Sequence, residues 1–63
     1  MERLMELRRE RVLSLRELEE KSGVSYNTIW RIEDRRQGAH PRTVRKLAEA
    51  LGVEPSELLK EGR

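Results

Sequence analysis

Asn27 and Arg31 stand four residues apart in the stretch SYNTIWRIED. On a helix, side chains at this spacing are neighbours on one face. Asparagine can form two hydrogen bonds with the edge of adenine, and arginine can form two with the edge of guanine. The pair therefore has the chemistry to read base edges. The same stretch holds the chain's only tyrosine and only tryptophan, Tyr26 and Trp30, and there is no phenylalanine.

Basic side chains are concentrated from this pair onward. Residues 31–46 contain two acids, Glu33 and Asp34, against six bases. The bases are Arg31, Arg35, Arg36, Arg42, Arg45 and Lys46. This segment is therefore net +4, and the rest of the chain sums to −2, because the whole chain carries +2. A local basic stripe is typical of a phosphate-binding surface, although charge alone favours the simpler interpretation of a solvated face.

The helix that precedes these residues has clear start and stop signals. Ser14 and Glu17 form the S-x-x-E pattern of a capping box, in which each side chain accepts from the other residue's backbone amide. Gly23 ends the helix, because glycine adopts a left-handed conformation at little cost. The sequence therefore predicts a helix that follows Ser14 and runs to Ser22.

The next helix is predicted over residues 26–35, with Ser25 as its N-cap and Val24 packed against it. Ile29 and Ile32 form its inward face. Advancing about 100° per residue places some side chains outward and Tyr26 on the flank. The outward side chains are Asn27, Trp30, Arg31 and Asp34.

Three further helices complete the prediction. The first covers residues 2–11, and Leu4 and Leu7 begin its apolar stripe. The fourth starts at Pro41, where a missing N–H costs nothing, and ends at Gly52. A short last helix follows Pro55. We therefore expect residues 1–63 to form a single all-α domain of five helices, with the helix-turn-helix unit at about residues 14–35.

Two segments carry a resemblance to a known family. LSLRELEEKSGVSYNTIWRIED and PRTVRKLAEALGVEPSELL resemble the phage-repressor-like (Cro/repressor type, lambda-repressor-like) helix-turn-helix domain. The resemblance covers about residues 3–60. It implies a compact five-helix fold, and it implies sequence-specific binding of double-stranded DNA, as a dimer, by a small transcriptional regulator.

The resemblance also implies roles for individual residues. Ser25, Tyr26 and Asn27 match the start of the recognition helix, which approaches bases and phosphates, and Arg31 matches a base-contacting position. Arg42 matches a position that meets the DNA backbone or minor groove. Phosphate contact is also the interpretation we favour for Arg35 and Arg36. Arg8 and Glu33 match a structural salt bridge between helices one and three.

Three positions depart from the family pattern. Leu15 replaces the usual glutamine at the start of helix two, and Glu19 replaces a small alanine that faces helix three. The Glu19 carboxylate must then reach solvent or find a partner, such as Arg16, Lys21 or the Trp30 indole. Trp30 itself replaces a small or polar residue.

Trp30 and Tyr26 leave two interpretations open. Trp30 could lie partly exposed over the side chains of helix two. Alternatively, Tyr26 and Trp30 could be anchors for another protein, as aromatic residues are at interaction hot spots. The alternative function is therefore a protein-interaction module of the antitoxin or adaptor kind.

Other functional classes have little support. The serines fit helix caps, His40 fits a loop or N-cap before Pro41, and a domain this small offers little room for a substrate cleft, so we expect no enzyme activity. A chain with one histidine and no cysteine predicts no metal site and no cofactor. Without a membrane span or secretory signal, we expect a cytoplasmic, nucleoid-associated protein of a prokaryote. Leu58 and Leu59 of the last helix are the expected homodimer contact.

Overall fold

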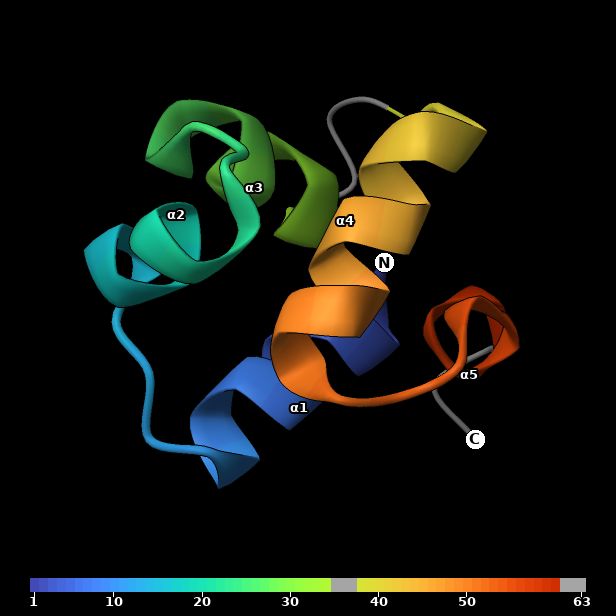
Figure 1. Cartoon of the computed structure of the whole chain (residues 1–63), viewed down its shortest axis with the longest axis horizontal. Coiled ribbons are helices and arrows are strands. Elements are labelled where there is room, and N and C mark those ends of the chain that lie inside the picture. The colour runs from blue at the N-terminus through green and yellow to red at the C-terminus, as the bar shows by residue number, and fades with distance from the viewer. Residues whose placement is uncertain (35–37, 61–63) are drawn as a thin grey trace.

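The computed structural model describes residues 1–34 and 38–60, and these residues form five helices and no strand. The helices are α1 (Glu2–Glu10), α2 (Leu15–Ser22), α3 (Tyr26–Glu33), α4 (Pro41–Leu51) and α5 (Pro55–Leu59), as Figure 1 shows. The all-α, five-helix prediction is therefore confirmed. No helix in this part of the chain is both long and apolar enough to span a membrane.

The helix starts predicted around the turn are present in atomic detail. The Glu17 amide donates to Ser14 Oγ at 3.0 Å, and the Ser14 amide donates to Glu17 Oε1 at 2.8 Å. Gly23 ends α2 with a φ of 78°. Ser25 Oγ then accepts from the Thr28 amide at 3.2 Å. These local bonds leave only residues 23–25 to join α2 to α3.

Two helices end earlier than predicted. In α1, the Val12 amide donates to the Arg9 carbonyl and the Leu13 amide to the Arg8 carbonyl, both at 3.0 Å. This is the Schellman pattern, which closes a helix by bonding its last carbonyls, so α1 ends at Glu10 and Arg11 is its C-cap.

Helix α3 is also shorter than predicted. This helix was predicted to reach about residue 35, but α3 ends at Glu33 and Asp34 is its C-cap. The predicted contacts Arg35 and Arg36 lie outside the described residues.

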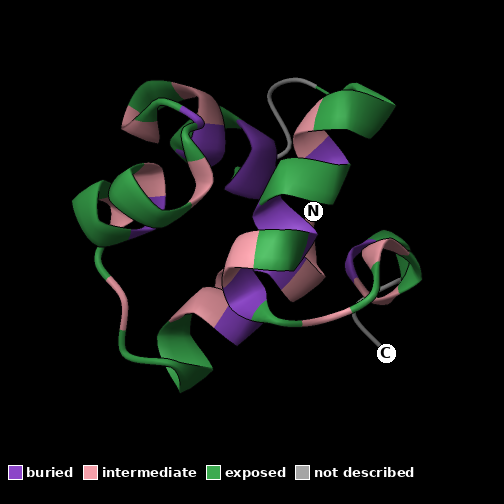
Figure 2. Ribbon diagram, in the orientation of Figure 1, coloured by how far each residue is buried: buried purple, intermediate pink, exposed green. Residues whose placement is uncertain are grey.

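The core is aliphatic and receives side chains from every helix. The buried apolar residues are Leu4, Leu7, Leu18, Val24, Ile29, Ile32, Val44, Leu47, Ala48, Leu51 and Leu58. In Figure 2 the buried positions turn toward the centre of the molecule and the exposed ones away from it. Helix α4 packs against both α2 and α5, and α1 packs against both α3 and α5. The core thus holds the helix-turn-helix unit on a support made by the other three helices.

The two leucines of α5 have opposite environments. Leu58 is completely buried, whereas Leu59 is 63% exposed. The prediction that both form a dimer contact is therefore wrong for Leu58, because a helix turns consecutive side chains about 100° apart and α5 directs Leu58 into its own core.

Arg8 and Glu33 form the interhelical salt bridge that the resemblance implied. Arg8 Nε lies 2.6 Å from Glu33 Oε2, and Arg8 Nη2 lies 3.1 Å from Oε1. Arg8 Nη1 also donates to the Leu13 carbonyl at 2.8 Å. Glu33 is buried and Arg8 nearly so. One guanidinium thus connects α1, the α1–α2 turn and the end of α3, and helps to fix the orientation of α3.

Candidate nucleic-acid interface

Helix α3 presents a polar face to solvent while its apolar face is fixed in the core. Ile29 and Ile32 are buried, with 0% and 1% of their surface exposed, whereas Asn27 and Arg31 are exposed. The predicted orientation of the helix is therefore confirmed. A bidentate amide and a bidentate guanidinium project from one face of a helix that is held at both ends, by Ser25 and by Glu33.

The side chains at the start of α3 differ in how freely they can reach a ligand. Ser25 is exposed, but its hydroxyl accepts from the Thr28 amide and donates to Thr28 Oγ1 at 3.0 Å. Tyr26 is half-buried on the flank of the helix, as predicted, and the guanidinium carbon of Arg16 lies 4.5 Å from the centre of its ring. Trp30 is 42% exposed, which is consistent with both interpretations of this tryptophan.

Glu19 does not form the ion pair considered as one alternative. It is half-buried, and no ion pair within the described residues includes it. Arg16, one of its predicted partners, lies over Tyr26 instead. No cation of the described residues therefore forms an ion pair with this carboxylate.

The start of α4 supplies the second part of the candidate surface. Pro41 is the first helical residue and His40 the N-cap, although no hydrogen bond caps the helix from the His40 side chain. Arg42 and Arg45 are exposed. In Figure 1 the first turn of α4 and helix α3 both reach the upper side of the molecule. The fold thus brings the first turn of α4 to the same side of the molecule as α3.

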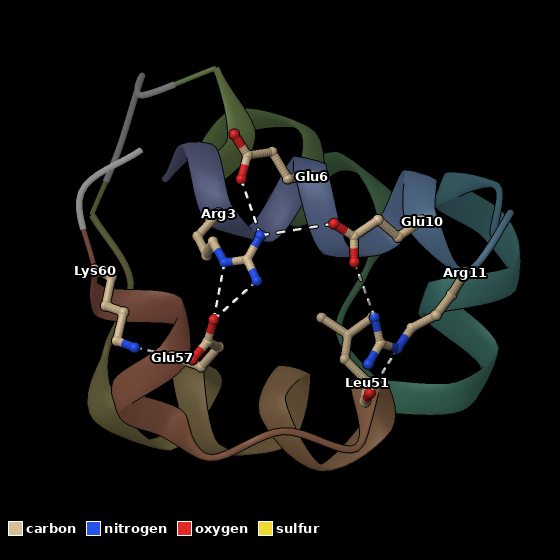
Figure 3. Close-up of polar contacts among 7 residues, drawn as sticks. All are labelled: Arg3, Glu6, Glu10, Arg11, Leu51, Glu57 and Lys60. Carbon is tan, nitrogen blue, oxygen red and sulfur yellow. Dashed lines mark hydrogen bonds and ion pairs between the residues drawn. The ribbon is translucent and has the colours of Figure 1, made fainter. Parts of the chain in front are cut away.

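Ion pairs are concentrated on α1 and α5. Arg3 of α1 donates twice to Glu57 Oε2 of α5, at 3.0 Å from Nε and 2.8 Å from Nη2. It also pairs with Glu6 and Glu10, and Lys60 pairs with Glu57 (Figure 3). The hydrogen bond from Arg3, followed by that from Lys60, lowers the pKa of Glu57 below its ordinary value. The same bond to Glu57 raises the pKa of Arg3.

The basic side chains of α2, α3 and α4 differ from those of α1 in their bonding within the chain. Arg3, Arg8 and Arg11 bond to carboxylates or carbonyls of the chain. Within residues 1–34 and 38–60, the basic side chains of α2, α3 and α4 form no ion pair. These are Arg16, Lys21, Arg31, Arg42, Arg45 and Lys46. In α1 and its C-cap, by contrast, Arg9 is the described arginine that is exposed and forms no ion pair, while Arg3, Arg8 and Arg11 are bonded within the chain.

Comparison with known families agrees with this arrangement. Residues 2–60 match the family described as a helix-turn-helix domain. The chain belongs to the helix-turn-helix domain family. This family binds DNA, so the helix-turn-helix match and the unpaired cations of α2, α3 and α4 point to the same kind of ligand. No curated protein sequence matches the chain.

Arg16 is not among the contacts predicted from the sequence, which indicates it only as a partner for Glu19. A signal was nevertheless present, because Arg16 is the second residue of α2 and Tyr26 is the first residue of α3. The steep crossing forced by a short glycine-containing turn can bring such positions together, but the sequence does not specify the crossing angle.

Proposed function

We propose that this helix-turn-helix protein is a small transcriptional regulator of the phage-repressor type that binds specific sequences in double-stranded DNA. In this proposal α3 enters the major groove, as recognition helices of this motif do. The observation that carries it is the exposed Asn27–Arg31 face of α3, next to cations that no carboxylate of the described chain neutralises.

The proposed contacts divide into reading and positioning roles. Asn27 and Arg31 read base edges, because their planar groups can form paired hydrogen bonds. Arg42 neutralises phosphate from the start of α4. Ser25, Tyr26 and Trp30 position α3 against the DNA. Arg35 and Arg36 complete the proposed set of phosphate contacts.

The proposed regulator binds as a homodimer, because one recognition helix covers only a half-site and paired half-sites are read by two-fold symmetric proteins. Leu59 is the exposed apolar residue of α5. It borders an apolar hollow of about 270 Å³ whose other walls are the start of α4 and Pro55. In a two-fold dimer, Leu59 of each copy would enter the hollow of the other copy. The same patch would then serve both copies, as a two-fold interface requires.

Salt dependence and sequence selection test the DNA-binding proposal together. Binding to random duplex DNA should weaken steeply from low to physiological salt, because each neutralised phosphate releases counterions. A random-site selection with the purified protein should also converge on a defined sequence. Absence of duplex binding even at low salt would rule the proposal out, and binding without any enrichment would leave a nonspecific DNA-binding protein.

The 42% exposure of Trp30 favours one alternative, a module that binds another protein through Tyr26 and Trp30. Aromatic anchors of this kind contribute mainly through desolvated contact, so their binding would depend little on salt. A Trp30→Ala variant that keeps full DNA affinity and steep salt dependence would remove Trp30 from the proposed DNA contacts. A loss of DNA affinity with an unchanged salt slope would place Trp30 on the DNA-binding face, because the slope counts neutralised phosphates.

A further inference from the structure

Arg16 is held by an aromatic ring rather than by a carboxylate. Its guanidinium carbon lies 4.5 Å from the centre of the Tyr26 ring, within the distance at which a cation is attracted to the ring face. Arg16 belongs to the first turn of α2 and Tyr26 to the first turn of α3. The contact therefore joins the two helices of the helix-turn-helix unit at one place.

The carboxylates nearest to Arg16 along α2 do not compete for it. Glu19 and Glu20 follow at the third and fourth positions, where a helix brings side chains together. Neither of them pairs with Arg16 in the described part of the chain. A basic residue that precedes its acidic partner by four positions is also the weaker order for such a pair. Arg16 thus keeps its full positive charge while its orientation is restricted.

A guanidinium that lies on a ring still has its donors free. The attraction between a cation and a ring is electrostatic, and it gives none of the five N–H donors of the guanidinium an oxygen acceptor. Arg16 is exposed, so these donors are accessible to a ligand. A planar fork of donors matches the oxygens of a phosphate, and restricting the side chain beforehand lowers the entropy lost when it binds.

We propose that Arg16, oriented by Tyr26, is a phosphate-binding residue of the DNA interface. This inference rests on the proposed DNA-binding function and adds a contact from α2 to those of α3 and α4. It also assigns a role to Tyr26, because the tyrosine ring acts here as a platform for the arginine.

The test compares the salt dependence of duplex binding in single variants. Arg16→Gln should lower the slope of log affinity against log salt by about 0.9, the amount expected for one lost phosphate contact. Arg9→Gln is the matched control, because Arg9 is an exposed arginine of α1, and its slope should equal that of the unmodified protein. Arg16→Lys should keep the slope with lower affinity, because lysine keeps the charge but lacks the planar stacking group.

A double-mutant cycle tests the role of the ring. In a Tyr26→Leu background, Arg16→Gln should reduce affinity at least threefold less than it does when Tyr26 is present, because the arginine is no longer oriented. Independent effects in this cycle would overturn the orienting role of Tyr26, and an unchanged slope in Arg16→Gln would overturn the phosphate contact. An unmodified protein without duplex binding at low salt would overturn the proposed function itself. Circular dichroism of each variant confirms that the helices are intact.

Discussion

Arg31 and Arg42 are both exposed arginines, but their places on the fold predict different effects on DNA binding. Arg31 projects from the outward face of α3 beside Asn27, whereas Arg42 lies in the first turn of α4. Arg31→Ala should therefore relax base preference at one position of the binding site and cost about 1–3 kcal/mol there. Random-site selection with each variant measures this change directly.

Arg42→Ala should behave differently from Arg31→Ala. Loss of a phosphate contact should weaken binding to all sequences alike and lower the salt slope by about one. Titrations against the selected site and against a scrambled duplex separate the two roles. An Arg31→Ala protein that selects the same sequence as the original would remove Arg31 from the base-reading residues.

Val12 is the non-glycine residue with positive φ among the described residues, at 54°. It occupies the C′ position of the Schellman pattern, which usually holds glycine, and it is 84% exposed. A left-handed conformation costs an L-residue roughly 1–2 kcal/mol, and a glycine at this position removes that strain. Glycine also loses more backbone entropy on folding, which costs about 0.5–1 kcal/mol. Val12→Gly should therefore stabilise the protein by about 0.5–1 kcal/mol in urea unfolding. Val12→Thr, which remains β-branched, should show no gain.

At the scale of the helices, the Arg8–Glu33 pair fixes α3 on its support. Arg8→Met would leave the Glu33 carboxylate buried without its cation and should destabilise the fold by about 3 kcal/mol. The double variant Arg8→Met/Glu33→Leu should recover most of this loss, because no buried charge remains. Urea unfolding of the three proteins measures the coupling. A double variant as unstable as the single one would show that packing of the arginine stem, and not charge, dominates.

The contact between α1 and α5 should make stability depend on acidity. Arg3 holds the pKa of Glu57 below its ordinary value in the folded protein, so the unfolded chain binds more protons in the acid range. The contribution of Glu57 is therefore complete above its unfolded pKa, about pH 4.3, and is lost as the pH falls through its lower folded value. Glu57→Gln should be less stable than the original at pH 6, and this difference should shrink toward pH 2.

A series of urea unfolding experiments and one control variant define that comparison. Urea midpoints at several pH values give the stability of each protein, and Glu49→Gln is the matched control because Glu49 is exposed and forms no ion pair among the described residues. Parallel stability profiles for Glu57→Gln and the original protein would show that the α1–α5 contact does not depend on this carboxylate.

At the scale of the whole molecule, the proposed dimer contact uses a surface residue, Leu59, that is not part of the buried core. Leu59→Lys introduces a charge at a position that is 63% exposed, so the monomer should keep its fold and stability. It should lose the dimer, and with it cooperative binding to paired half-sites. Light scattering after size-exclusion chromatography gives the mass of each protein. A purely monomeric original protein at concentrations that saturate its binding site would contradict the dimer.

Much of the helical framework could be predicted from the sequence because its signals are local. The capping box of Ser14 and Glu17, the cap at Ser25 and the left-handed Gly23 and Gly52 each depend on residues within one turn of a helix. The spacing of Ile29 and Ile32 likewise determined which face of α3 is buried, and hence that Asn27 and Arg31 are exposed.

Tertiary structure decided the features that join distant segments. Arg3 meets Glu57 across 54 positions of sequence, Leu58 rather than Leu59 enters the core, and Arg16 lies on Tyr26 instead of pairing with Glu19. Each depends on the angle at which two helices cross, and that angle is set by side-chain packing over the whole core. The residue pattern predicted the exposed face of the proposed recognition helix, but only the packed fold showed which arginines are neutralised and which remain available to a ligand.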